Sequence, residues 1–271
     1  MSDASQKGAR PAIAFENLGH CYLPGQWVFR DYSARLERGC IAALLGRNGR
    51  GKTTLLRLLL GLLKPTRGEM RVHGRAAFAP QNFQCAFGYS ALDVVLMGRA
   101  RHVGLFSQPT RRDEQAALSA LERFGLAEKA RQPFQQLSGG QKQLALIARA
   151  LVSEAEIIVL DEPAAALDMK NQLLALGRIA SLARDFGLTV VFTTHHPAHA
   201  LDIADEAWLM LGENDFVAGA ADDVLSEANL TRLYDTPIKR LAFEHQGRRM
   251  ETILPLMVRE SGGPGPMSSS E

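Results

Sequence analysis

Apolar runs divide the chain into a strand-rich first part and a later part in which strands and helices alternate. Apolar and polar residues alternate over 12–18, and β-rich runs follow over 27–36, a pattern typical of antiparallel strands. Three other runs, at 40–46, 156–160 and 188–193, are almost wholly apolar. Strands of that kind are buried on both faces and indicate a parallel sheet. The pattern therefore predicts an α/β chain with antiparallel strands in its first part.

Helical spacing appears in two later segments. Apolar residues recur every three or four positions over 110–126 and 173–187, and these segments stop at Gly125 and Gly187. The second helix lies between two buried strands, which is the order of a βαβ unit. We expect the stretch from about 87 to 150 to be mostly helical, and no internal repeat is present.

Composition narrows the functional classes. The 271 residues are 46% hydrophobic and 22% charged, which excludes a disordered chain and is enough for a sizeable core. The formal net charge is +2 with interspersed signs, which argues against nucleic acid as a partner. Three cysteines without CxxC spacing, Cys21, Cys40 and Cys85, predict reduced thiols in a cytosolic protein. The apolar run 55–63 is too short to cross a bilayer and contains Arg57.

A glycine-rich loop, GRNGRGKTT at 46–54, follows a predicted buried strand and opens a predicted helix. In such a loop successive backbone N–H groups point inward at the β-phosphate of a nucleotide. Lys52 is then expected to reach the β- and γ-phosphate oxygens, and Thr53 to offer its hydroxyl to Mg²⁺. The alternative is a tight turn with a surface lysine, which the flanking strand and helix disfavour.

Two carboxylates, Asp161 and Glu162, follow the apolar strand at 156–160. Ligands of doubly wound sheets bind at the carboxyl ends of the strands, where these side chains are expected. Asp161 can hold Mg²⁺ through water, and Glu162 can orient and deprotonate an attacking water. Alternatively the two acids end a strand and cap the next helix. Joined to the glycine loop, they are the parts of an ATP hydrolase.

A second loop, LSGGQ at 137–141, puts two glycines behind a serine at the start of an amphipathic helix, which is another anion-binding arrangement. Together with GRNGRGKT, IIVLDEP, ALD and TTHH, in this order, it resembles the ATP-binding subunit of ABC transporters. The resemblance implies a P-loop ABC-type ATPase fold of class α/β, with a mixed sheet core, an N-terminal antiparallel β-subdomain and an inserted helical subdomain.

The resemblance also implies the domain boundaries. One ABC ATP-binding domain is expected over 12–258, with its helical subdomain at about 87–150. The polar residues 1–11 and the Gly/Pro/Ser-rich residues 261–271 are expected to be flexible tails.

In this family two ATP-binding subunits meet head to tail, so that the signature loop of one covers the ATP held by the other. The implied catalytic residues are Glu162, His195 and Gln81. The implied ATP-binding residues of one subunit are Tyr22, Gly46, Asn48, Gly49, Gly51, Lys52, Thr53, Thr54 and Asp161. Those implied to act across the dimer are Ser138, Gly139, Gly140, Gln141 and Asp168, and those implied to lie beside Mg²⁺ are Thr53, Gln81 and Asp161.

Two of these assignments have alternatives. Tyr22 resembles the aromatic residue that stacks on adenine, but Trp27 and Phe29 lie nearby, and Tyr22 also fits as an ordinary strand residue. His195 resembles the γ-phosphate sensor, whereas its spacing from His199 also fits a zinc pair with no local third ligand. The family most often has Asp after the sensor histidine, where this chain has another histidine.

The segments FGYSALDVVLMGR, LSGGQKQLALIARAL and LTRLYDTPI resemble importer ATPases that serve iron siderophores, haem, cobalamin or, in one branch, molybdate or tungstate. The resemblance implies ATP-driven import at the cytoplasmic face of the cell inner membrane, with peripheral attachment. The implied partners are a second copy of the chain, two permease subunits and, indirectly, an extracytoplasmic substrate-binding protein, with no nucleic acid. The permease is expected to dock near Phe83 to Met97, with Phe83 and Phe87 as anchors, while Val94, Val95 and Met97 fit the lobe's own core equally well.

Three other functions fit parts of the pattern. An exporter ATPase shares the motifs. A soluble ABC-type ATPase of DNA repair is disfavoured because the interval between Lys52 and Asp161 is too short for its coiled coils, and one of translation because a single cassette is present. A non-catalytic binding module is disfavoured because Lys52, Asp161 and Glu162 are all present.

Overall fold

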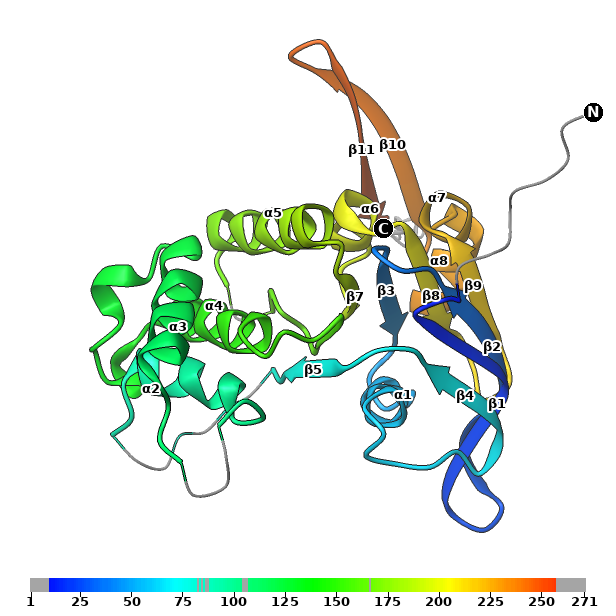
Figure 1. The fold of residues 1–271 in the computed structure, drawn as a ribbon. Coiled ribbons are helices and arrows are strands. Elements are labelled where there is room, and N and C mark those ends of the chain that lie inside the picture. The colour runs from blue at the N-terminus through cyan, green and yellow to red at the C-terminus, as the bar shows by residue number, and fades with distance from the viewer. Residues whose placement is uncertain are drawn as a thin grey trace, which may run out of the picture.

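The computed structural model describes residues 10–81, 83, 85, 88–103, 107–165 and 167–256. In this part of the chain the centre is a six-stranded sheet, parallel throughout except for one antiparallel edge strand (Figure 1). In spatial order its strands are β5 (Ala76–Ala79), β6 (Ile157–Leu160), β7 (Thr189–Thr194), β3 (Ile41–Gly46), β8 (Glu206–Met210) and β9 (Phe216–Ala220). The predicted mixed sheet is confirmed.

The central strands are apolar because both faces of the sheet are covered. Alternate residues of β3 belong to two separate cores: Ala43 and Leu45 to one built with the helices, Ala42 and Leu44 to the other. The second core is shared with α1 (Lys52–Leu59) and an antiparallel sheet of order β2-β1-β4. Its strands are β1 (Ile13–Leu23), β2 (Gln26–Leu36) and β4 (Arg67–Val72). The predicted N-terminal antiparallel strands are therefore confirmed as well.

Helices between β5 and β6 form a lobe on one side of the sheet (Figure 1). They are α2 (Ala91–Leu96), η1 (Met97–Arg99), α3 (Arg111–Arg123), η2 (Ala127–Lys129), η3 (Phe134–Gln136) and α4 (Gly139–Leu151). Side-chain capping boxes begin α2, α3 and α4, at Ser90, Thr110 and Ser138. Such caps satisfy N–H groups that have no partner within the helix, which fixes where each helix starts.

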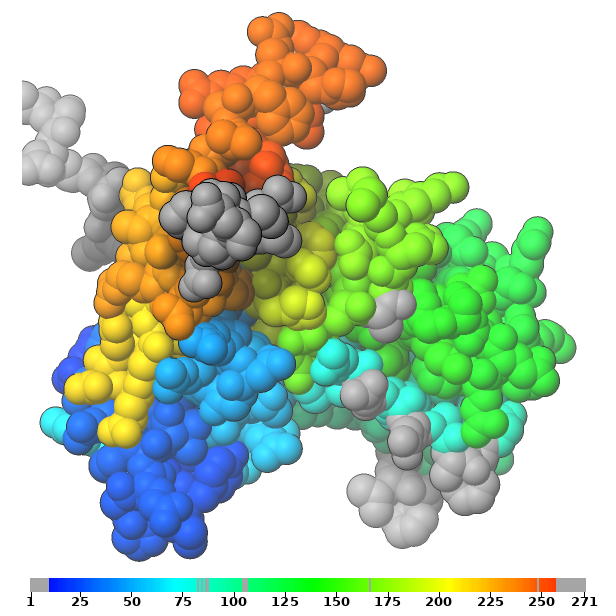
Figure 2. All heavy atoms as spheres, turned by 180° about the vertical axis from the view of Figure 1, so that it is seen from behind, coloured from blue at the N-terminus to red at the C-terminus, as the bar shows by residue number. Residues whose placement is uncertain are grey.

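The chain after β6 packs helices on the sheet and ends in an isolated hairpin. The helices are α5 (Met169–Phe186), α6 (Pro197–Ile203), α7 (Ala221–Val224) and α8 (Glu227–Tyr234). The α5 helix ends at Gly187 in the left-handed conformation, as its sequence predicts. Strands β10 (Ile238–His245) and β11 (Arg248–Pro255) then form a two-stranded sheet that stands clear of the body (Figures 1 and 2).

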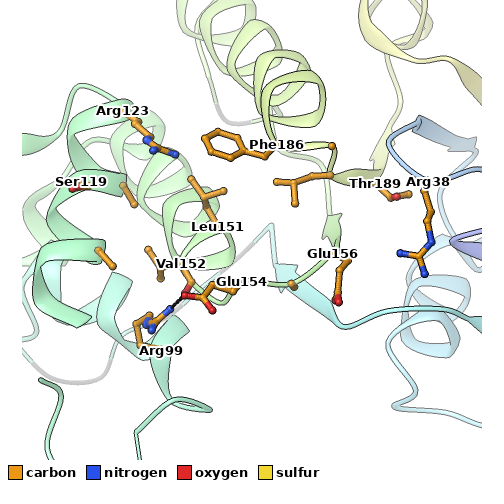
Figure 3. A pocket seen from close by; sticks show the side chains of 15 residues that line it. Arg38, Arg99, Ser119, Arg123, Leu151, Val152, Glu154, Glu156, Phe186 and Thr189 are labelled. Carbon is orange, nitrogen blue, oxygen red and sulfur yellow. Dashed lines mark hydrogen bonds and ion pairs between the residues drawn. The ribbon is translucent and has the colours of Figure 1, made fainter. Parts of the chain in front are cut away.

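A buried ion pair fastens the lobe to the entrance of β6. Arg99 Nε donates to Asp113 Oδ1 at 2.9 Å, and both side chains are only 7% exposed. Arg99 Nη1 also donates to Glu154 Oε1 and to the Val152 carbonyl. Hydrogen bonds from Thr110, joined by Arg99, hold the pKa of Asp113 well below its usual range. Arg99, Val152 and Glu154 border a cavity of about 500 Å³, and Arg123 faces Phe186 at another edge of it (Figure 3).

We expect Arg99→Met to lower the free energy of unfolding by about 3 kcal/mol, because it leaves a buried carboxylate without its cation. Urea unfolding followed by circular dichroism measures this. The matched control is Arg123→Met, which loses only the guanidinium 4.7 Å above the Phe186 ring and is expected to cost about 1 kcal/mol or less. Equal effects of the two substitutions would contradict a special contribution from the buried pair.

Candidate active site

The glycine loop between β3 and α1 has a position that only glycine fits. Gly51 has a φ of +93°, and a Cβ at this residue would lie 2.5 Å from Val28 Cγ1. Lys52 follows as the first residue of α1, and its Nζ donates to the Gly46 carbonyl at 2.7 Å. The loop therefore places a lysine and the N-terminus of a helix together, an arrangement that favours phosphate.

The lysine faces the carboxylates that end β6. Burial lowers the pKa of Lys52, and the negative charges of Glu162 and Asp161 oppose this shift. Thr53 is exposed beside it, whereas Thr54 is buried. The structure thus brings together the loop and the acids, which are more than a hundred positions apart in the sequence.

Thr193, which the sequence analysis did not single out, links the two acids. Its Oγ1 donates to Asp161 Oδ1 at 2.7 Å and accepts a hydrogen bond from the Glu162 backbone N–H at 2.8 Å. Glu162 has a φ of +47°, a region that side chains larger than glycine rarely occupy. Thr193 therefore holds an unfavourable backbone conformation in place. A signal was present in the sequence, since a threonine at the carboxyl end of a buried strand lies where the neighbouring strand presents its acids.

The Glu162 carboxylate contacts the two residues predicted to assist it. Gln81 Nε2 donates to Glu162 Oε2 at 3.0 Å, and His195 Nδ1 lies 3.3 Å from the same oxygen. The three side chains follow β5, β6 and β7. The Glu162 side chain is 15% exposed, so it is shielded by these neighbours but still reachable by water. A carboxylate held in this way can accept a proton from a water molecule.

The backbone of His195 is fixed by a residue that sequence reasoning missed. Tyr234, at the end of α8, donates its hydroxyl to the His195 carbonyl at 2.9 Å. Only the position of Tyr234 in the LTRLYDTPI segment hinted at it, because nothing in the sequence indicates that α8 returns to this loop. The segment after β7 is thus held by the C-terminal part of the chain.

The zinc alternative receives no support. Among the residues that the structure describes, no group of three or more His, Cys, Asp or Glu side chains could hold a metal ion. Burial lowers the pKa of His199 to about 4, and its Nδ1 lies 3.5 Å from Thr194 Oγ1. The contact with Thr194 therefore explains the position of the His199 side chain without a bound metal ion.

The signature residues cap their own helix. The Ser138 side chain accepts a hydrogen bond from the Gln141 N–H, and Gln141 Oε1 accepts one from the Ser138 N–H. Asp168 likewise caps α5 by accepting from the Asn171 N–H at 2.8 Å. Figure 1 shows α4 in the helical lobe and α1 on the other side of β5. The helix that follows the signature loop and the helix that follows the glycine loop therefore lie on separate parts of the molecule.

Of the three candidate adenine-stacking rings, Tyr22 is the most exposed. Its side chain is 55% exposed, and its hydroxyl lies 3.0 Å from Thr54 Oγ1, directly after the glycine loop. Phe29 is fully buried and stacks on Tyr32, so it is excluded. Trp27 packs against Gly19.

We expect Tyr22→Leu to raise the Kd for ATP about tenfold, which corresponds to about 1.4 kcal/mol of base stacking. Equilibrium binding of a fluorescent ATP analogue measures it. Tyr22→Phe retains the ring and loses the contact with Thr54, so its Kd should stay near that of the parent. A tenfold loss from Trp27→Leu with none from Tyr22→Leu would move the stacking role to Trp27.

In the segment predicted to contact a permease, only some of the described side chains are exposed to solvent. Val94 and Val95 are fully buried in the lobe, so the core interpretation holds for both. Phe83 is half-buried and packs edge-on against Phe134, with ring centres 5.7 Å apart, so its role as an anchor stays a prediction. Phe87 lies outside the described residues, and Tyr89 and Met97 are exposed.

Comparisons with known proteins decide the family. A family model described as ABC transporter matches residues 29–165. The chain is 43% identical to the molybdate import ATP-binding protein MolC of Haemophilus influenzae, over 89% of this chain and 94% of the relative. The chain belongs to the ABC transporter family. It is an ATP-binding subunit with ATPase activity coupled to transport.

Solved ABC transporter structures agree with the fold. A chain assigned to a metal-chelate type ABC transporter, in an inward-facing conformation, superposes with a TM-score of 0.87 at 40% identity, covering 92% of this chain and 98% of its own. The ATP-binding cassette MJ0796, solved as a dimer with ADP and Pi, gives a TM-score of 0.64 at 26% identity, covering 73% and 93%. Within the described residues, no helix of this ABC subunit is long and apolar enough to cross a membrane. The individual site residues stay predictions.

Proposed function

We propose that two copies of this chain close head to tail on two ATP molecules, and that hydrolysis there powers import through membrane permease subunits. The observation that carries the proposal is the convergence of Gln81 and His195 on one oxygen of Glu162. The residues that follow three neighbouring strands, β5, β6 and β7, therefore meet at the Glu162 carboxylate. The negative charge of this carboxylate acts on Lys52, the lysine proposed to bind phosphate. No part of a simple binding module needs this arrangement.

Glu162 acts as the general base in this proposal. A water molecule gives its proton to the Glu162 carboxylate as its oxygen bonds to the γ-phosphorus, and the bond from that phosphorus to the β-γ bridging oxygen breaks to release ADP. Gln81 and His195 orient the carboxylate. Lys52 offsets the charge that develops on the phosphate oxygens.

Three residues proposed to surround the ATP phosphates also fit Mg²⁺. Thr53 offers an exposed hydroxyl and Asp161 a carboxylate, and because Gln81 donates its Nε2 to Glu162, its amide oxygen remains as a third oxygen donor. Oxygen donors of these kinds are the ligands Mg²⁺ takes in phosphate sites, where the bound ion offsets phosphate charge.

The signature loop completes the site of the other copy. Ser138, Gly139, Gly140 and Gln141 begin α4, so the positive end of its dipole and the N–H groups outside the Ser138–Gln141 capping box are proposed to face a partner's γ-phosphate. Asp168 begins α5 and is proposed to cross the same interface. Head-to-tail pairing is supported by the separation of α4 from α1 within one chain (Figure 1).

The proposed cargo is a metal chelate such as an iron siderophore, haem or cobalamin. It is supported by the 40% identity to a chain of a metal-chelate type transporter. Molybdate or tungstate is the second candidate, favoured by the 43% identity to a molybdate import protein. We further propose peripheral attachment at the cytoplasmic face of the inner membrane, an extracytoplasmic binding protein, and permease docking near Phe83 to Met97, where Tyr89 and Met97 are exposed.

Reconstitution with copurifying permease subunits in proteoliposomes tests the function. Phosphate release is measured with binding proteins loaded with ferric siderophore, haem, cobalamin or molybdate on the outer side. The proposal expects one cargo to raise ATPase activity and to accumulate inside, with neither effect in a Glu162→Gln complex. Export of cargo, or hydrolysis without any permease association, would contradict it.

A further inference from the structure

His195 is linked to the rest of the molecule through its ring and through its backbone. The ring Nδ1 lies 3.3 Å from Glu162 Oε2, and the carbonyl accepts a hydrogen bond from the Tyr234 hydroxyl at 2.9 Å. The His195 side chain is 44% exposed, so its neighbours enclose it only in part. The direction in which the imidazole points therefore depends on where the backbone of this residue is held.

The backbone at His195 lies in a turn between two regular elements. It follows β7, and His196 is the N-cap residue of α6. Thr194 Oγ1 accepts a hydrogen bond from the His196 N–H at 3.0 Å, and the His196 carbonyl accepts one from the His199 N–H at 3.1 Å. These bonds join residues of the turn and of α6 to one another, so they do not fix the turn relative to α8.

Packing leaves room beside this turn. A cavity of about 370 Å³ lies between residues 195–198 and residues near the base of the β10–β11 hairpin, among them Tyr234, Ile253 and Pro255. Because side chains do not fill this space, close packing does not hold the turn on that side. Within the described part of the chain, the Tyr234 hydroxyl is the group that reaches the His195 carbonyl from this side.

Tyr234 is itself held firmly. It is the last residue of α8, and Leu230 and Leu233 of the same helix are buried. Burial raises the pKa of Tyr234, so its hydroxyl keeps its proton and remains a donor throughout the neutral pH range. A fixed helix therefore presents a permanent hydrogen-bond donor to the His195 carbonyl.

We propose that Tyr234 is a positioning residue for ATP hydrolysis, whose hydroxyl holds the His195 backbone so that the imidazole stays in contact with the Glu162 carboxylate. The inference rests on the function proposed above, in which Glu162 is the base. A displacement of about 1 Å in an orienting group can lower a rate by up to about 100-fold. The rate of hydrolysis thus depends on α8, a helix that contributes none of the predicted site residues.

Tyr234→Phe tests the inference, because it removes the hydroxyl and keeps the ring that packs on the core. Phosphate release by the full chain, measured over a range of ATP concentrations, is expected to give a kcat about tenfold below that of the parent. The KM for ATP should stay within about twofold, since the hydroxyl contacts none of the residues predicted to bind ATP.

Tyr32→Phe is the matched control. Tyr32 is fully buried, and its hydroxyl also donates to a backbone carbonyl, that of Gly212 in the turn between β8 and β9. Each Phe variant loses one hydrogen bond of the same kind, so both should lower the thermal midpoint by about 2–4 °C. Tyr32→Phe is expected to keep the kcat of the parent.

A double-mutant cycle with His195→Ala separates positioning from a general effect on stability. In the His195→Ala chain no imidazole remains to be oriented, although the backbone carbonyl is still present. Adding Tyr234→Phe there should lower the single-turnover rate by less than about twofold, while it lowers the thermal midpoint as much as it does in the parent. A hydroxyl that acted only through the stability of the fold would cost the same factor in both backgrounds.

Three results would overturn the inference: a parent-level kcat in Tyr234→Phe, an equal loss of rate in the two backgrounds, or an equal loss of kcat in Tyr32→Phe. Glu162→Gln, assayed beside them, keeps the two proposals apart. If Glu162→Gln is inactive and Tyr234→Phe has the kcat of the parent, only the role of Tyr234 fails. If Glu162→Gln hydrolyses ATP at the parent rate, the proposed base fails, and the cycle still decides whether Tyr234 acts through His195.

Discussion

Replacing Glu162 by glutamine is expected to lower ATP hydrolysis at least about 100-fold and to leave ATP binding intact, so that ATP-bound dimers accumulate. Glutamine keeps the size of the side chain and can still contact Gln81 and His195, but it cannot take a proton from water. Phosphate release measures the first effect. Gel filtration with ATP and Mg²⁺ measures the second, as a shift from monomer to dimer.

Glu128→Gln is the matched control, since Glu128 is an exposed glutamate of the lobe. It should hydrolyse ATP at the parent rate and show no trapped dimer. If Glu162→Gln also turned over ATP at the parent rate, the base would have to be another group, and the contacts from Gln81 and His195 would need a different explanation.

Ser138→Arg is expected to abolish hydrolysis while leaving the affinity of the monomer for ATP nearly unchanged, because the arginine occupies the place proposed for the partner's phosphate. Lys52→Ala should instead weaken ATP binding itself. Mixing the two variants gives a dimer in which one composite site carries both substitutions and the other carries neither. Partial recovery of phosphate release on mixing is the expected result.

Ser138 also caps α4, so the cost of losing a cap has to be separated from the effect on catalysis. Ser226→Arg removes the side-chain cap of α8, which should cost stability by a similar amount of about 1 kcal/mol and leave hydrolysis in place. Inactivity of both arginine variants would assign the effect to folding. Full activity of Ser138→Arg alone would remove the signature loop from the site.

The sequence predicts the core of this fold because strands that are buried on both faces of a sheet consist almost wholly of apolar residues. The apolar runs become β3, β6 and β7, and the glycine that ends the predicted second helix is the C-cap of α5. The glycine loop is equally readable, since Gly51 has both a positive φ and no room for a Cβ. Local geometry of this kind depends on few neighbours.

The contacts around Glu162 were less accessible to sequence reasoning. Thr193 and Tyr234 act through strands and helices that meet only after folding, and a single hydroxyl carries no periodic signal. The sequence analysis did not predict the β10–β11 hairpin, although the residues of its turn are recognisable. Gln246 and Gly247 both have positive φ, as a type I′ hairpin turn requires. The exposed apolar face of the flanking strands, however, does not enter the core of its own subunit.

At Glu162 the left-handed backbone conformation lowers the stability of the fold, whereas the side chain is proposed to be required for activity. Glycine adopts that conformation without steric cost and asparagine at little cost, whereas a glutamate there gives up free energy of the order of 1 kcal/mol. A selection for heat resistance alone would therefore drift towards glycine or asparagine at this residue and discard the carboxylate. Substitutions that raise thermal stability and abolish ATP hydrolysis should therefore be frequent at this residue. A search for thermostable variants of this protein would need to measure ATP hydrolysis as a second criterion.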